Sequence, residues 1–118
     1  PLIVGGGGGR LDHLLAILAL FDRPRYPAAW LTAHEEAVVV DEHIRLVDMQ
    51  DEVVSLFPVG QERCTMRSSG LQWPLDDLEW GRGDHGVSNV VVAAVAELRM
   101  TSGRLLLVRS TARQPGAR

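Results

Sequence analysis

The sequence predicts a mainly β protein: a C-terminal β-sandwich preceded by one strand–glycine turn–helix unit, the last piece of a truncated α/β domain. Two observations carry this prediction. A Leu- and Ala-rich stretch at 11–20 follows five consecutive glycines. After Pro27, short β-rich runs alternate with turns roughly every eight to twelve residues, which is typical of a sandwich or barrel. A single strand–helix unit cannot bury both of its faces, so we expect the upstream part of the α/β domain to be missing.

The composition is that of an ordinary globular protein, and it excludes several functional classes. The chain has 118 residues, 15 acidic and 12 basic side chains, and a formal net charge of −3. This mild acidity argues against a nucleic-acid partner, and the longest apolar run is shorter than the about 20 residues that a membrane helix needs. The single cysteine, Cys64, excludes an internal disulfide and a cysteine-based zinc site. We expect a cytoplasmic protein.

Residues 1–30 form the predicted remnant of the α/β domain. Residues 1–4 are apolar and indicate the end of a buried strand, and the five glycines at 5–9 cannot continue as strand or helix. Residues 11–20 contain neither Gly nor Pro, and their leucines recur at helical spacing, which predicts a helix buried on most sides. Two prolines end this helix. Because the chain begins at Pro1 and not at a methionine, we interpret it as a fragment.

Residues 31–110 form the predicted β-sandwich, and residues 111–118 form a polar tail. The Thr-Ser-Gly-Arg sequence at 101–104 predicts a hairpin between the last two strands. The β-rich runs lie at 29–32, 37–41, 43–48, 53–58, 64–67, 90–100 and 105–109.

The first chemical signal is the glycine run with the residues that follow it. Glycines between a strand and a helix let backbone N–H groups approach phosphate oxygens, and the helix N-terminus favours negative charge. Arg10 could clamp a phosphate, and Asp12 could hold Mg²⁺ or orient a nucleophile. A tight connection between a strand and a helix explains the glycines equally well. An ordinary carboxylate in the first turn of a helix is the alternative interpretation of Asp12. For His13 we favour a partly buried helix histidine without a chemical role.

The second and third signals lie in the β block. Trp73 stands between Gly70 and Pro74 in an irregular segment, where an indole can stack on a flat or cationic ring, although a core or interface tryptophan is the commoner case. Residues 81–89 alternate glycines with small polar residues, including Ser88 and Asn89, and so offer hydrogen bonds to a ligand. A long β-connection is the alternative interpretation of this segment.

Two other combinations carry no catalytic signature. The sequence His34-Glu35-Glu36 lacks the second histidine that a His-Glu-x-x-His zinc site requires. The pair Asp84-His85 has no nucleophile motif nearby, so it does not indicate a hydrolase.

The order and spacing of the three signals are more specific than any one of them. The chain contains Gly-Gly-Gly-Arg-Leu-Asp-His at 7–13, Ser-Gly-Leu-Gln-Trp-Pro-Leu at 69–75 and Gly-Val-Ser-Asn at 86–89, followed by the hairpin at 102–108. This arrangement resembles the thiamin pyrophosphokinase (thiamin diphosphokinase) family over about residues 3–109.

The resemblance implies an enzyme that transfers a pyrophosphoryl group from ATP to the hydroxyethyl oxygen of thiamin, giving thiamin diphosphate and AMP with Mg²⁺. It implies an α/β nucleotide-binding domain followed by a β-sandwich, in a homodimer that binds thiamin between the α/β domain of one subunit and the β domain of the other. Arg10 and Asp12 would be catalytic, and Asp12 would also be the metal ligand.

For the remaining site residues, the resemblance implies a nucleotide side and a thiamin side. Gly7, Gly8 and Gly9 would bind nucleotide phosphate together with Arg10, whereas Trp73 would stack on thiamin and Ser88 and Asn89 would line its pocket. The family's Asp-rich motif for Mg²⁺ and ATP lies upstream of the glycine turn, and this sequence does not contain it.

Two functional hypotheses follow. The first is the C-terminal portion of a thiamin diphosphokinase. The second is a non-catalytic β-sandwich that binds a heteroaromatic ligand or dimerises, which the missing acidic motif favours for the isolated chain. A stand-alone nucleotide-binding protein fits poorly, because only one strand–helix unit is present.

Overall fold

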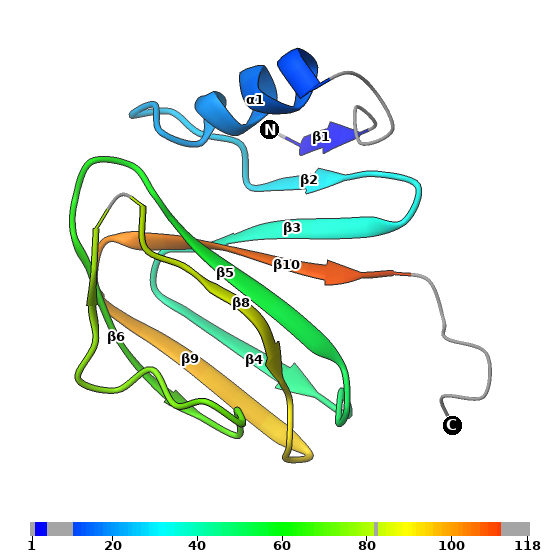
Figure 1. The fold of residues 1–118 in the computed structure, drawn as a ribbon, viewed down its shortest axis with the longest axis vertical. Coiled ribbons are helices and arrows are strands. Elements are labelled where there is room, and N and C mark those ends of the chain that lie inside the picture. Colours follow the sequence, from blue (N-terminus) through cyan, green and yellow to red (C-terminus); the bar gives the residue numbers. More distant parts are fainter. Residues whose placement is uncertain (1, 5–10, 82, 112–118) are drawn as a thin grey trace.

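The computed structural model describes residues 2–4, 11–81 and 83–111 (Figure 1). The glycine turn and residues 112–118 of the predicted tail therefore lie outside the described residues. The prediction of a mainly β fold is confirmed, because ten strands and one helix make up the described elements. These are β1 (Leu2–Val4), α1 (Leu11–Leu20), β2 (Ala29–Leu31), β3 (Glu35–Val40), β4 (His43–Val47), β5 (Val53–Val59), β6 (Cys64–Ser69), β7 (Glu79–Trp80), β8 (Gly86–Val90), β9 (Val95–Ser102) and β10 (Arg104–Ser110).

The larger sheet has six strands in the order β1-β2-β3-β10-β5-β8. Strands β1 and β2 are parallel and are joined through α1, whereas the other neighbouring pairs are antiparallel. Parallel neighbours need such a crossover connection, which explains why a helix separates two short strands of one sheet. Strand β10 lies in the middle of this sheet, between β3 and β5, although it is the last described strand in chain order.

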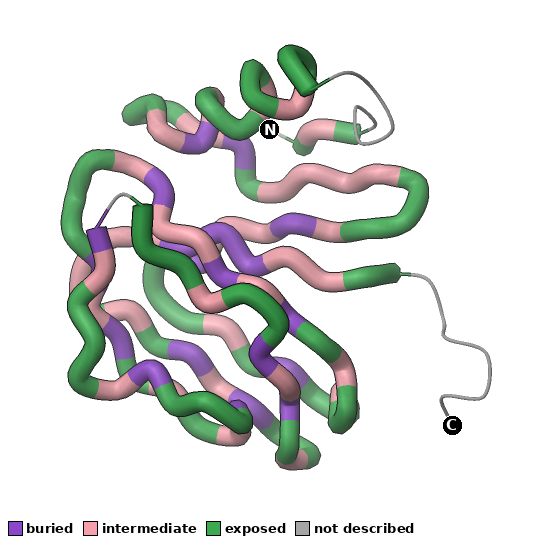
Figure 2. The backbone as a smooth tube through the Cα atoms, in the orientation of Figure 1, coloured by how far each residue is buried: buried purple, intermediate pink, exposed green. Residues whose placement is uncertain are grey.

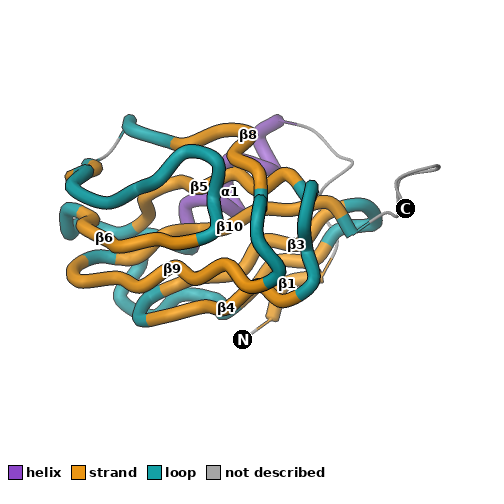
Figure 3. Tube along the Cα trace, turned by 90° about the horizontal axis from the view of Figure 1, so that it is seen from below, coloured by secondary structure: helices purple, strands orange, loops and turns teal. Residues whose placement is uncertain are grey.

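The smaller sheet has the order β4-β9-β6-β7 and packs against the larger one across a shared apolar core (Figure 3). Alternate residues of each strand point into this core, as the pleat of a strand requires. Leu105 and Leu107 of β10 contribute from the larger sheet, and Met66 of β6 and Leu98 of β9 contribute from the smaller one. The hairpin predicted at 101–104 joins β9 to β10, with Gly103 at φ 71°.

A second, smaller cluster covers the opposite face of the larger sheet, where α1 lies. Phe21 is fully buried there with Val59 and Leu106, and the Trp30 ring stacks on Phe21 with 6.4 Å between ring centroids. Trp30 therefore has the packing role that its position in a β-rich run suggests. Ile17 is the α1 side chain that packs against this cluster.

The expectation that α1 is buried on most sides was wrong. None of its residues is buried, and Leu11, Leu15 and Leu18 are exposed (Figure 2). Strand β1 is likewise an exposed strand and not a buried one, since Leu2 and Val4 are largely solvent-accessible. Leucines at helical spacing mark an apolar surface but do not specify what covers it. No helix within the described ranges is long and apolar enough to cross a membrane.

The predicted strand at 90–100 was also wrong, because the chain changes sheets inside it. Residues up to Val90 belong to β8 of the larger sheet, and residues from Val95 belong to β9 of the smaller sheet. The crossing is fixed by other segments: Val92 N–H donates to the Gly70 carbonyl at 2.8 Å, and the Ala94 carbonyl accepts from Asp48 N–H at 2.8 Å. The segment at 86–89, for which the sequence left open a ligand-binding segment or a long β-connection, forms most of the edge strand β8.

Candidate functional site

Trp73 and Asn89 come together although 16 residues separate them. The buried Asn89 amide accepts a hydrogen bond from the Trp73 N–H at 3.1 Å and donates to the Trp73 carbonyl at 2.8 Å. Its Oδ1 also accepts from the N–H of Val90 at 2.9 Å. One asparagine side chain thus fixes both backbone polar groups of the tryptophan, in the way that a neighbouring strand would.

The loop that carries Trp73 is tied to the end of β8 before the indole and to β6 after it. The Gln72 N–H donates to the Val90 carbonyl at 2.8 Å, and Leu71 forms an isolated bridge with Val91. Gly70 is required before this loop, because it has φ 79° and a Cβ there would lie 2.8 Å from the Ala96 Cα. On the other side of the indole, the Leu75 N–H donates to Ser68 Oγ at 2.8 Å.

These contacts hold a large aromatic side chain in solvent. Trp73 is 54 % exposed, whereas Asn89, which holds its backbone, is 3 % exposed. An exposed indole on a fixed backbone presents an apolar, electron-rich face at little entropic cost, and such faces bind flat or cationic rings. The geometry therefore favours a ligand-stacking Trp73 over a core tryptophan.

Ser88 lies next to Asn89 on the exposed side of β8. Its backbone has φ 64°, a left-handed conformation that is uncommon for any residue other than glycine. The Ser88 N–H donates to the Ser55 hydroxyl at 3.0 Å, beside an irregularity in the β5–β8 pairing between Val54 and Leu56. Such bulges and strained backbones re-aim side chains and concentrate at functional sites.

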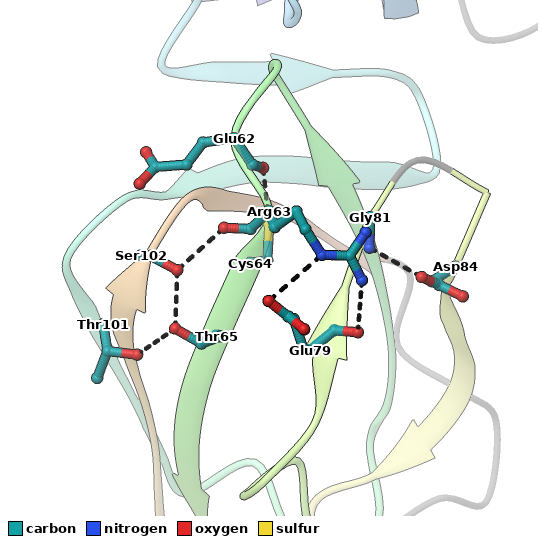
Figure 4. A network of polar contacts seen from close by, with 9 residues as sticks. All are labelled: Glu62, Arg63, Cys64, Thr65, Glu79, Gly81, Asp84, Thr101 and Ser102. Carbon is teal, nitrogen blue, oxygen red and sulfur yellow. Dashed lines mark hydrogen bonds and ion pairs between the residues drawn. The ribbon is translucent and has the colours of Figure 1, made fainter.

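The described residues just before β8 form an ordinary turn. The Asp84 carboxylate accepts from the Gly81 N–H at 2.8 Å (Figure 4). The Asp84 N–H donates back to the Gly81 carbonyl at 3.1 Å. The His85 ring lies against Phe57, with 6.3 Å between centroids. Asp84 therefore closes a turn, as the interpretation of this segment as a β-connection requires.

The predicted nucleotide side is described only through Asp12. Asp12 lies exposed in the first turn of α1, where a carboxylate is favoured by the helix dipole, and its Oδ1 accepts from the His13 N–H at 2.9 Å. Gly7, Gly8, Gly9 and Arg10 lie outside the described residues. The structure thus brings Trp73 and Asn89 together, with Ser88 next to Asn89 in β8, and places Asp12 on a separate element.

Sequence reasoning missed the junction between α1 and the two sheets, which is built around Arg104. Its guanidinium donates to the carbonyls of Phe21 at 2.8 Å and Arg23 at 3.1 Å, just beyond the end of α1. It also lies over the Tyr26 ring at 3.9 Å from the centroid, and the Tyr26 hydroxyl donates to Asp41 at 2.9 Å. The sequence carries no local signal for these contacts, because the bonded residues lie 81 and 83 positions away.

A polar cavity of about 220 Å³ opens at this junction, lined in part by Tyr26, Asp41 and Arg104. The hydrogen bond to the Asp41 carboxylate raises the pKa of Tyr26 above its ordinary value, and burial adds to the effect. The tyrosine therefore remains a protonated donor at neutral pH. The cavity does not include Trp73 or Ser88, so it is distinct from the thiamin side of the predicted site.

Comparison with known families decides the relationship of the chain. The family described as "Thiamin pyrophosphokinase, vitamin B1 binding domain" matches residues 41–105. The chain belongs to the thiamin pyrophosphokinase family. The resemblance predicted from the three motifs is confirmed, and the matched range of the vitamin B1 binding domain contains Trp73, Ser88 and Asn89 but not Asp12. No curated protein sequence gives a significant match to the chain.

Solved structures of thiamin pyrophosphokinases share this fold. The enzyme from Bacillus subtilis superposes with a TM-score of 0.75 at 19 % identity, covering 95 % of this chain and 55 % of that one. The enzyme from Geobacillus thermodenitrificans gives 0.70 at 24 % identity, covering 96 % and 54 %. The enzyme from Candida albicans gives 0.70 at 14 % identity, covering 92 % and 43 %. The chain thus spans about half the length of these proteins.

Proposed function

We propose that the chain is the C-terminal portion of a thiamin diphosphokinase, which transfers a pyrophosphoryl group from ATP to the hydroxyethyl oxygen of thiamin. The observation that carries the proposal is the exposed Trp73, whose backbone the buried Asn89 clamps beside the strained Ser88, within a vitamin B1 binding domain. In this proposal residues 1–30 are the remnant of the α/β catalytic domain, residues 31–110 are the thiamin-binding β-sandwich and residues 111–118 are a tail.

On the thiamin side, Trp73 supplies the stacking surface. Thiamin carries a permanent positive charge on its thiazolium ring, and an indole face attracts such a cation by about 0.5–2 kcal/mol. Ser88, exposed and adjacent to Asn89, would line the thiamin pocket with its hydroxyl. The Asn89 amide is occupied by the Trp73 backbone, so its contribution is to position the indole, and a direct contact of Asn89 with thiamin remains a prediction.

On the nucleotide side, Gly7, Gly8 and Gly9 would present backbone N–H groups to phosphate oxygens, and Arg10 would neutralise charge on the transferred group. Asp12 would accept the proton of the thiamin hydroxyl or hold Mg²⁺, whose chemistry is to neutralise phosphate charge. Within the described ranges no group of three His, Cys, Asp or Glu side chains could hold a metal ion. Asp12 alone fits the usual mode of Mg²⁺, in which one or two carboxylates share the ion with substrate phosphates and water.

The proposal includes a homodimer in the cytoplasm, with ATP as co-substrate. A non-catalytic thiamin-binding module is the second candidate. The family match favours it, since residues 41–105 correspond to the vitamin B1 binding domain alone.

Calorimetric titration of the chain with thiamin tests the proposal. We expect saturable binding, and we expect Trp73→Ala to weaken it by about 1–2 kcal/mol, or about 5- to 30-fold, whereas Trp73→Phe keeps most of the affinity. A change in thiamin affinity on adding MgATP favours the kinase, and thiamin binding that ignores MgATP favours the module. Equal affinities of the parent and Trp73→Ala proteins would contradict the stacking role.

A further inference from the structure

The outer face of the four-stranded sheet carries a row of three basic side chains. The registers place Arg67 of β6 directly opposite Arg99 of β9, and Arg99 directly opposite His43 of β4. All three are exposed, and they alternate along their strands with core residues such as Leu98, so they lie on the solvent side of the sheet. Because neighbouring strands are about 5 Å apart, the row spans about 10 Å.

The Glu97 carboxylate is shared among the basic side chains of this face: its hydrogen bond with His43 and, with smaller effect, the charges of Arg45 and Arg99 lower its pKa. Glu97, two residues from Arg99 on β9, has its Oε2 at 2.9 Å from His43 Nε2 and 3.7 Å from Arg45 Nε. Neither Arg67 nor Arg99 forms an ion pair with any residue in the described part of the chain. Arg67 and Arg99 are thus directly opposite each other in the strand register, and the charge of Glu97 beside them is shared with His43 and Arg45.

Other arginines of the same chain do have partners. Arg63, the residue immediately before β6, has its Nε 3.4 Å from Glu79 Oε2 on the neighbouring strand β7 (Figure 4). Arg109 of β10 lies between two glutamates, at 3.0 Å from Glu36 and 3.3 Å from Glu52. Like charges directly opposite each other destabilise an antiparallel pair, so Arg67 and Arg99 form a costly arrangement in a chain that has more acids than bases.

We propose that Arg67 and Arg99, with His43 beside them, bind the phosphate group of a small soluble anion. A tetrahedral phosphate has oxygens for two guanidinium forks at once, which suits two arginines on neighbouring strands. A dianion also balances two cations, and a row of about 10 Å suits an inorganic phosphate or pyrophosphate group. This site is separate from the predicted nucleotide side, which lies on the glycine turn and α1, and it does not depend on the proposed function.

Titration calorimetry with sodium pyrophosphate and with inorganic phosphate, at ionic strength held constant with sodium chloride, tests the proposal. We expect one saturable site, and we expect Arg67→Gln and Arg99→Gln each to weaken binding about tenfold, the size of a lost charge-assisted hydrogen bond. Arg45→Gln is the matched control, because Arg45 is an exposed arginine on the same face that already pairs with Glu97. We expect this control to change the affinity less than twofold.

Urea unfolding provides a second test, because a purely structural role of the two arginines would not give the changes in unfolding midpoint that we expect. Without added phosphate and at low salt, Arg67→Gln and Arg99→Gln should unfold at the same or a higher urea concentration than the parent, because each removes a repulsion. Pyrophosphate should raise the midpoint of the parent and not that of the two variants.

Three results would overturn the proposal. These are the absence of saturable binding above the chloride background, an equal loss of affinity in the Arg45→Gln control, and destabilisation of both variants without phosphate. Binding to anionic lipid vesicles without binding to pyrophosphate would show that the surface recognises a membrane and not a small anion.

Discussion

Replacing Arg104 by methionine should loosen the attachment of α1 to the two sheets. The variant keeps the apolar stem and removes the guanidinium, and with it the hydrogen bonds to the carbonyls of Phe21 and Arg23 and the contact with the Tyr26 ring. Two hydrogen bonds from a charged donor contribute about 1.5 kcal/mol each at the low end, and the cation–π contact adds about 0.5 kcal/mol.

One feature of the site reduces this loss. The Arg104 Nε atom is buried without a hydrogen-bond partner in the described structure, and removing such a group recovers about 1 kcal/mol. The expected net destabilisation is therefore about 2–3 kcal/mol. With a urea dependence of about 1–3 kcal/mol per molar, the unfolding midpoint should fall by about 1 M.

Urea unfolding followed by tryptophan fluorescence measures the total effect, and amide hydrogen exchange locates it. We expect faster exchange around residues 21–26. The amides of the core strands β9 and β10 should still exchange with the free energy of global unfolding of the variant. Arg45→Met is the matched control, since an exposed ion pair contributes about 0–1 kcal/mol. If Arg104→Met were as stable as this control, the assignment of Arg104 as the tie between α1 and the sheets would be wrong.

Three further predictions follow from the site and its surroundings. Asn89→Ala should weaken thiamin binding, and in a double-mutant cycle with Trp73→Ala the two losses should not add, because one residue acts through the other. Tyr26 is the single tyrosine of the chain, so absorbance at alkaline pH reports its ionisation alone; it should titrate above the usual pH of about 10, and Asp41→Asn should bring it down. The stabilisation from this hydrogen bond is present below the pKa of the unfolded tyrosine and is lost as the pH rises through the raised folded value. Burial raises the pKa of the Cys64 thiol, so a thiol reagent at pH 8 should modify it only as fast as the protein unfolds, and rapid labelling of the folded protein would contradict the burial.

Local patterns in the sequence predicted helices and hairpins well where glycine or proline residues mark the ends of the element. The helix at 11–20 was predicted with its observed bounds, because a glycine run and two prolines frame a stretch of leucines and alanines. The hairpin at Gly103 was predicted for the same reason. The break between β8 and β9 was not, because no Gly, Pro or other turn residue marks it at 91–94, and the chain is held there by hydrogen bonds with distant residues, among them Gly70 and Asp48.

The candidate site shows the same division between local and distant information. Trp73 and Asn89 were each singled out from their own motifs, but the amide contact between them joins a loop to strand β8, and no periodicity in the sequence relates the two. The resemblance to the family supplied their grouping, and the structure supplied the reason that the indole is held in solvent. The sequence indicated Arg104 only as a turn residue, because its hydrogen-bond partners Phe21 and Arg23 are 83 and 81 positions away in the chain.

The position of β10 determines when this protein can fold during its synthesis. Strands β3 and β5 are made early, yet each presents a row of unpaired backbone groups to a gap that only β10 fills. The 51 residues from the end of β5 to the end of β10 take a ribosome roughly 3–10 s. Throughout that interval the nascent chain carries two open strand edges, the surfaces through which incomplete sheets aggregate. The yield of folded protein should therefore depend on how well those edges are shielded before residue 110 emerges.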